Sequence, residues 1–192
     1  MTFLPHTLIL LSTSALLLAN PYESSEEELN SVIQTGQKAS SELLKTLGGN
    51  LKKHMKSGGP LKAADFCISN AYPLTDKVSN DLGSDVSVKR VSLKYRNPAN
   101  APLSDEAVVL TALENLQKGG VMLPKHLVKK VDKETYKFYK PLKINKGVCL
   151  KCHGVIKNRE LAKKIDKHYP QDKAIGYQKG DLRGAIVVTV KK

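Results

Sequence analysis

Apolar residues near the start of the chain recur at three- and four-residue intervals, which predicts a long helix over residues 25–57. Ser25 followed by Glu28 is typical of a capping box at the start of a helix. Two glycines and a proline at positions 58–60 predict where the helix ends. A second helix is expected over residues 61–70, followed by a third helical piece after Pro73.

Further along the chain, alternating apolar and polar positions predict strands. The apolar positions of residues 86–88 and of residues 91–95 alternate in different phases, so a bulge or bend is expected near Lys89. Two more strands are predicted over residues 136–144 and 184–190. Helices in front and strands interleaved behind them indicate an α+β domain.

Two shorter helices are predicted among these strands, over residues 104–118 and 159–168. Ser104 and Asp105 are expected to cap the first of them. The residues of this helix expected to face inward are Val108, Val109, Ala112, Leu113 and Leu116.

The first residues of the chain predict export. An apolar stretch over residues 8–18 is too short to span a bilayer, which takes about 20 residues. Ala19 offers a small residue for cleavage, so residues 1–20 are interpreted as a signal peptide. No Lys or Arg precedes the stretch, and an uncleaved anchor is the alternative. Residues 21–192 then form a single domain, and the expected location is the periplasm.

The formal net charge is +13, from 31 basic and 18 acidic residues. Such a surface favours anionic partners. Nucleic acid is not expected as a partner of an exported protein. An acidic redox partner and peripheral contact with anionic lipid headgroups are the two remaining expectations.

Residues 149–153 read Cys-Leu-Lys-Cys-His, which is the spacing of covalent c-type haem attachment. In that interpretation Cys149 and Cys152 bind the haem vinyl groups, and His153 is an axial ligand of the iron. A bare CxxC is also found in redox disulfides and in zinc sites, but zinc requires further ligands at a matching spacing. The histidine directly after the second cysteine favours haem.

The sequence alone leaves the second axial ligand open. No methionine follows His153, which argues against the small electron carriers whose axial methionine comes after the motif. Met55 and Met122 are explained equally well as ordinary helix or core residues. Cys67, the third cysteine, is by composition alone more simply a small buried hydrophobic residue.

Several separate segments together carry a resemblance to a known family. They are Ala-Asp-Phe-Cys at 64–67, the stretch 91–102 that ends in Arg-Asn-Pro-Ala-Asn-Ala-Pro, residues 139–142, the motif at 149–154, and residues 172–185. With these segments the chain resembles a small family of exported haem domains with a PAS-like fold, which are also found attached to bacterial signalling proteins. The resemblance covers most of the chain from about residue 29 onwards.

The resemblance implies a fold and a ligand set. The implied fold is a PAS-like antiparallel sheet with flanking helices and a long N-terminal helix. The implied cofactor is one covalently attached haem c whose iron is bound by His153 and, on the opposite side, by Cys67. Because a thiolate donates electron density and stabilises ferric iron, a low reduction potential is expected.

Two arginines are candidates to pair with the haem propionates. Guanidinium groups fit carboxylates bidentately, and Arg96 and Arg183 lie in segments that carry the resemblance. The alternative for both is that they brace a loop or lie at the surface.

The expected function is redox or small-gas sensing. Binding of CO, NO or O2 at the iron, or a change in its oxidation state, would alter the bond to Cys67 and the helix that carries it. The chain contains no recognisable output segment, so the signal would pass to an unidentified redox or signalling protein. The alternative is a periplasmic electron-transfer cytochrome that docks an acidic partner. No catalytic residues are predicted, and an enzyme is not expected.

Overall fold

The computed structural model describes residues 24–192. The expected signal peptide, residues 1–20, lies outside this part of the chain. Within residues 24–192, none of the helices combines the length and the apolar character needed to cross a membrane.

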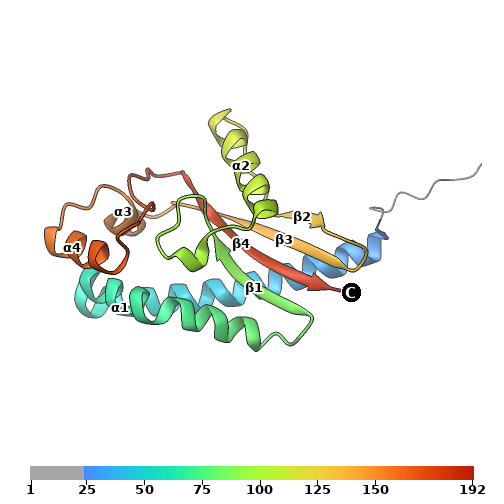
Figure 1. Ribbon diagram of the computed structural model, residues 1–192, viewed down its shortest axis with the longest axis horizontal. Coiled ribbons are helices and arrows are strands. Elements are labelled where there is room, and N and C mark those ends of the chain that lie inside the picture. The colour runs from blue at the N-terminus through green and yellow to red at the C-terminus, as the bar shows by residue number, and fades with distance from the viewer. Residues whose placement is uncertain (1–23) are drawn as a thin grey trace, which may run out of the picture.

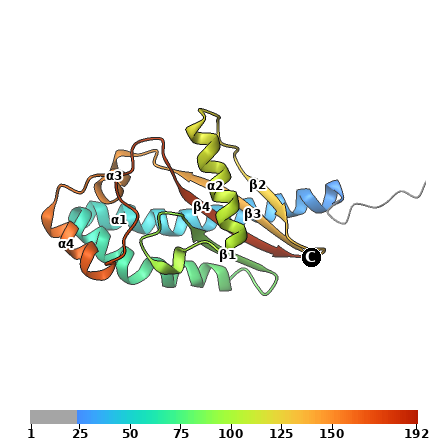
Figure 2. The ribbon, with the colours of Figure 1, turned by 45° about the horizontal axis from the view of Figure 1, so that its top comes forward.

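The first element, α1 (Glu26–Asn80), is bent back on itself (Figures 1 and 2). Ser25 caps its start by accepting a hydrogen bond from the Glu28 amide at 3.1 Å. The helical geometry breaks at Gly58 and Gly59, and Gly59 has φ 66°, which favours glycine. We call residues 26–57 the first limb and residues 60–80 the second limb. The predicted long first helix and its end at 58–60 are therefore confirmed.

A four-stranded antiparallel sheet packs against α1, with the strand order β1-β4-β3-β2. The strands are β1 (Val86–Val91), β2 (Leu127–Lys130), β3 (Thr135–Lys143) and β4 (Leu182–Lys191). The buried residues that join α1 to the sheet are Val32, Ala39, Leu43, Val78, Val88, Tyr136, Phe138, Ile186, Val188 and Val190. This apolar layer makes the sheet and the two limbs one body.

The opposite face of the sheet carries α2 (Ser104–Lys118), which projects from the body in Figure 1. A short 3-10 turn, η1 (Pro98–Asn100), precedes it. The apolar residues between α2 and the sheet include Val91, Leu110, Tyr139, Ala185 and Val187. Successive residues of a strand point to opposite faces, so Val88 and Arg90 face α1 while Lys89 and Val91 face α2.

Two further helices, α3 (Gly147–His153) and α4 (Arg159–His168), lie beside the bend of α1 in both views (Figures 1 and 2). Asn158 caps α4 by accepting from the Leu161 amide at 2.9 Å. Leu161 and Ile165 of α4 pack against Ala64 of the second limb. The predicted α+β fold, an antiparallel sheet with flanking helices and a long N-terminal helix, is confirmed.

The second limb and β1 differ from the sequence prediction. The helix continues through Pro73 to Asn80, because Pro73 is exposed and the carbonyl that loses its partner belongs to Ser69, also an exposed residue. β1 pairs with β4 in continuous register up to its end at Val91, so the bulge or bend expected near Lys89 and the strand expected over residues 91–95 are both wrong. Both faces of β1 are covered, and its apolar residues therefore follow no single phase. The register shift lies in β3, between Leu142 and Lys143.

The face of α2 also differs from the prediction. Leu113 is buried and Val109 packs against the core as predicted. Val108 is 68% exposed, Leu116 is 39% exposed, and Ala112 is also exposed. Glu106 and Leu110 are buried in their place. The cap residue is Leu103, whose amide donates to the Glu106 carboxylate at 2.9 Å. The helix is rotated from its expected orientation because Glu106 turns towards lysines of the sheet.

Candidate functional site

The helix α3 carries all three residues of the predicted attachment motif. Cys149 and Cys152 are three residues apart, so they lie on neighbouring positions of one helical face. Both are free thiols with part of their surface exposed. Cys149 packs beside Ile144, Ala174 and Tyr177, a small cluster. Cys152 packs against a separate cluster, which includes Ala64 of the second limb.

The His153 imidazole is held by its Nδ1 atom. Nδ1 lies 2.9 Å from the carbonyl oxygen of Ala174, and since a carbonyl can only accept, Nδ1 carries the hydrogen and donates. This assigns the tautomer and leaves the lone pair of Nε2 available to a metal. The Tyr177 ring stands edge-on to the imidazole, with the ring centroids 6.3 Å apart.

The charge state of His153 also suits a metal ligand. Burial lowers the pKa of His153 to about 3, and the nearby cations Arg183 and Arg96 act in the same direction, against the hydrogen bond to Ala174. The imidazole is therefore neutral over the physiological range of pH. A neutral ring is the form that binds iron.

The segment around Ala174 is fastened to α3 through its main chain. The Tyr177 amide donates to the carbonyl of His153 at 2.9 Å, and the Gly176 amide donates to that of Gly154 at 3.2 Å. Asp172 accepts from the Ala174 amide at 2.7 Å. The acceptor of the His153 hydrogen bond is thus itself held in place.

Arg96 braces this arrangement. Its Nε donates to Asp172 at 2.9 Å, and its Nη2 donates to the carbonyls of Cys152 at 2.6 Å and Ala174 at 3.2 Å. The side chains of Arg96 and Asp172 are 14% and 10% exposed. One guanidinium thereby joins α3 to the segment that orients His153. Pairing of Arg96 with a propionate stays a prediction.

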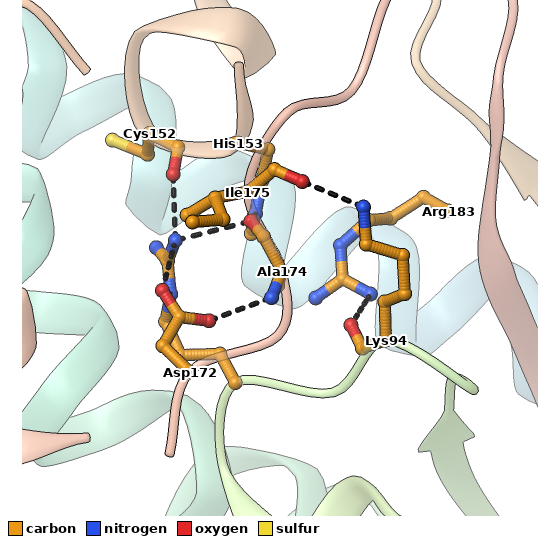
Figure 3. A network of polar contacts seen from close by, with 8 residues as sticks. Lys94, Cys152, His153, Asp172, Ala174, Ile175 and Arg183 are labelled. Atoms are coloured by element: carbon orange, nitrogen blue, oxygen red, sulfur yellow. Dashed lines mark hydrogen bonds and ion pairs between the residues drawn. The ribbon is translucent and has the colours of Figure 1, made fainter. Parts of the chain in front are cut away.

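In Figure 3, Arg183 and Lys94 lie on the opposite side of the view from Cys152 and Asp172, with Ala174 between them. Arg183 donates through Nη1 to the Ser92 hydroxyl at 2.7 Å and to the carbonyl of Lys94 at 3.1 Å. Lys94 donates to the carbonyl of Ile175 at 2.7 Å. Both cations lie against the Tyr177 ring, at 5.4 and 4.5 Å from its centroid. A propionate role for Arg183 also stays a prediction.

Cys67 lies on the second limb of α1, one helical turn from Ala64, and therefore on the side that meets Cys152. The residue is exposed, so the buried position that composition alone favoured is wrong. Desolvation by the surrounding protein nevertheless raises the pKa of the Cys67 thiol, while the positive charge of Arg90 acts in the opposite direction. The charge of Cys152 also raises the pKa of this thiol, and that of Arg96 lowers it. The fold thus brings Cys67 near the attachment motif, 82 residues away in the sequence numbering.

Arg90 was not among the residues expected from sequence. Its Nε atom is buried and has no hydrogen-bond partner, one of two such side-chain atoms in the described residues. Its Nη2 lies 3.5 Å from the carbonyl of Ala71, at the limit of a hydrogen bond. A clue was the position of a charged residue directly before Val91 and two residues after Val88, on the strand face that also carries Val86.

These groups fit a covalently attached haem. Two free thiols share one helical face, a neutral imidazole offers Nε2, and a buried arginine Nε lacks a partner. Residues 24–192 contain no group of three or more His, Cys, Asp or Glu side chains suited to hold a metal ion, so no further zinc ligands accompany Cys149 and Cys152 there.

Comparison with known proteins identifies relatives of this chain. The Tll0287-like family model, described as Tll0287, matches residues 11–191. A crystal structure described as that of the cyanobacterial heme-protein Tll0287 is similar at a TM-score of 0.59 and 27% sequence identity. The similarity covers 88% of this chain and 98% of that one. A search of curated proteins gave no match.

Proposed function

Because the chain belongs to the Tll0287-like family, we propose that it is a monohaem protein that attaches its haem through Cys149 and Cys152. In each attachment the thiol S–H would add across a vinyl C=C bond, so that a C–S bond would form and the hydrogen would end on the neighbouring carbon. No oxidant or reductant is consumed. The observation that carries the proposal is His153, fixed by Ala174 with Nε2 free, one residue from a free thiol.

His153 and Cys67 are the residues that would bind the haem iron. They come from different elements, α3 and the second limb of α1, which are in contact. Haem supplies an iron that changes by one electron between the ferric and ferrous forms. The role of the chain is to present Nε2 in a fixed tautomer and a sulfur from the facing helix, and to keep cations around both.

Sensing is the proposed use of this iron, by redox state or by binding of CO, NO or O2. The support is the position of Cys67 on α1, because this helix packs along β1, β3 and β4. A change at Cys67 would reach the sheet through the same helix that forms its apolar layer. The signal would then pass to a protein partner whose identity is open.

Electron transfer is the second candidate, supported by the net charge of +13. In that case the iron cycles without exchange of Cys67, and the basic surface docks an acidic partner in a salt-sensitive reaction. Both candidates assume export to the periplasm through residues 1–20, and neither assigns a catalytic residue.

The test is absorption and EPR spectroscopy of protein matured with haem in the periplasm, in ferric and ferrous forms, with and without CO. Sensing predicts a low-spin thiolate-ligated ferric signal and a CO adduct on reduction. The Cys67→Ala variant should keep its covalent haem and lose the thiolate signal. A ferrous spectrum indifferent to CO would favour electron transfer, and an unchanged Cys67→Ala spectrum would exclude Cys67 as a ligand.

A further inference from the structure

Arg90 occupies an exceptional position in the sheet. It lies on the same face of β1 as Val88, which belongs to the apolar layer under α1. Its register partner on β4 is Ile186, also part of that layer. The guanidinium extends from this layer towards Ala71 on the second limb. Ala71 lies one helical turn after Cys67, so Arg90 faces the helix surface that carries this thiol.

Most of the hydrogen-bonding capacity of Arg90 is unused within residues 24–192. There its one bond is the contact of 3.5 Å to the carbonyl of Ala71, and its buried Nε has no partner. By contrast, Arg96 has three bonds between 2.6 and 3.2 Å, and Arg183 has two of 2.7 and 3.1 Å. A buried charged donor without an acceptor is costly, so an anionic group at this position would be stabilised.

Cys67 is the anionic candidate that the surroundings supply. Against the effect of desolvation, the positive charge of Arg90 lowers the pKa of the Cys67 thiol, and a Cys67 thiolate raises the pKa of Arg90. The charge of Arg183 lowers the pKa of Arg90, and that of Tyr169 raises it. Burial lowers the pKa of Arg90, but an arginine remains charged at physiological pH.

We propose that Arg90 is the charge partner of the Cys67 sulfur and sets the reduction potential of the site. The inference rests on the proposed ligation by Cys67 and deepens it. A guanidinium beside the sulfur draws electron density from it, which weakens its donation to iron. The same positive charge stabilises the electron added on reduction. Both effects raise the potential above that of a thiolate site without the arginine.

The experiment is a potentiometric titration of the haem-loaded full chain, with EPR of the ferric form, for Arg90→Gln and Arg90→Lys. Arg159→Gln is the matched control, because Arg159 is exposed at the start of α4. Arg90→Gln is expected to shift the midpoint to more negative potential and to change the g-values. Arg90→Lys, which keeps the charge, should shift it less, and the control should leave both unchanged. An unshifted potential in Arg90→Gln overturns the proposal.

The Cys67→Ala background separates the sulfur from a haem propionate as the group that Arg90 serves. If Arg90 acts through the sulfur, Arg90→Gln shifts the potential less once Cys67 is alanine, because only the direct effect of the charge on the iron then remains. An equal shift in both backgrounds would assign Arg90 to a propionate and overturn the proposal. Absence of a thiolate signal in the unmodified chain would overturn the ligation by Cys67 as well, so EPR distinguishes this failure from that of Arg90 alone. Should Arg90→Gln not fold, the same comparison is made with Arg90→Lys.

Discussion

The two faces of the sheet bury charge in opposite ways. Under α2, the fully buried Glu106 carboxylate accepts from Lys89 at 2.9 Å, from Lys137 at 3.1 Å and from the Leu103 amide at 2.9 Å. Lys137 also donates to Asp105 at 2.7 Å. On the face under α1, the Arg90 guanidinium has one contact of 3.5 Å and an unpartnered Nε.

The charged groups under α2 are therefore fully paired within residues 24–192, whereas Arg90 under α1 is not. Glu106 and the lysines that it pairs with hold α2 against the sheet, and their charges are compensated by one another. The buried Nε of Arg90 keeps an unused N–H donor, on the side of β1 that faces the helix carrying Cys67. The Tyr139 hydroxyl under α2 is also buried and unpartnered, but it is neutral and therefore costs less than an unpaired charge.

The largest expected effect on stability is that of Glu106→Ala. It leaves Lys137 nearly buried with one carboxylate fewer, and we expect a loss of about 3–5 kcal/mol in the free energy of unfolding. Urea denaturation of the haem-loaded chain measures it, with exposed Glu160→Ala as the control. The reduction potential should not change. A shifted potential would contradict the assignment of Glu106 to the stability of the fold alone.

A substitution of Arg96 distinguishes two roles for this residue: holding α3 to the segment around Ala174, and pairing with a haem propionate. Arg96→Lys keeps the charge but loses the fork that reaches Asp172 and the carbonyl of Cys152, so we expect a loss of about 2–3 kcal/mol. Urea denaturation and potentiometry are run on the same variant. Unchanged stability with a shifted potential would instead support the propionate role expected from sequence.

Gly36 tests how tightly the α1 face is packed. A Cβ at Gly36 would collide with the Phe138 ring, so Gly36→Ala should destabilise by about 1–3 kcal/mol. At Gly48, also in the first limb, nothing lies near an added Cβ, and Gly48→Ala should stabilise by about 0.5–1 kcal/mol. Thermal unfolding compares the two variants, and equal signs would contradict the packing described.

The smallest expected effect is the contribution of Asp105 to the loss of stability at acid pH. Partial burial alone would raise the pKa of Asp105, but the hydrogen bond and charge of Lys137, with the charge of Lys129, lower it overall. Its stabilisation is therefore present above the unfolded pKa of about 3.9 and is lost as the pH falls towards the lower folded value. Asp105→Asn should remove at most about 1 kcal/mol of that dependence, because the side chain is 30% exposed.

That dependence is read from urea denaturation at a series of pH values between about 2 and 6. Asp166→Asn, at an exposed position of α4, is the control and should follow the unmodified chain. If Asp105→Asn also followed the unmodified chain through this range, the ion pair with Lys137 would contribute nothing to stability.

Local patterns predicted the elements with one clear apolar face or a distinct signal at their ends. The range expected for α4, residues 159–168, agrees with the structure, and the glycines at 58 and 59 marked the bend of α1. β3 and β4 were predicted within two residues at each end. The short strand β2 and the helix α3 were not predicted, because neither is long enough to show a period.

Contacts between residues that are distant in the sequence could not be predicted from local patterns. The orientation of α2 depends on Glu106 meeting Lys89 and Lys137, which come from separate strands. The site shows the same limit. The motif identified Cys149, Cys152 and His153 by spacing alone, whereas the approach of Arg90 to Cys67 required the sheet and the second limb to be placed together.

The most direct test of the central claim is intact-mass spectrometry of the denatured chain after maturation with haem, with the Cys149→Ala/Cys152→Ala variant beside it. We predict that the unmodified chain keeps one haem after denaturation, that Cys67→Ala also keeps it, and that the double variant keeps none. Loss of haem from the unmodified chain on denaturation, or its retention by the double variant, would contradict covalent attachment at α3.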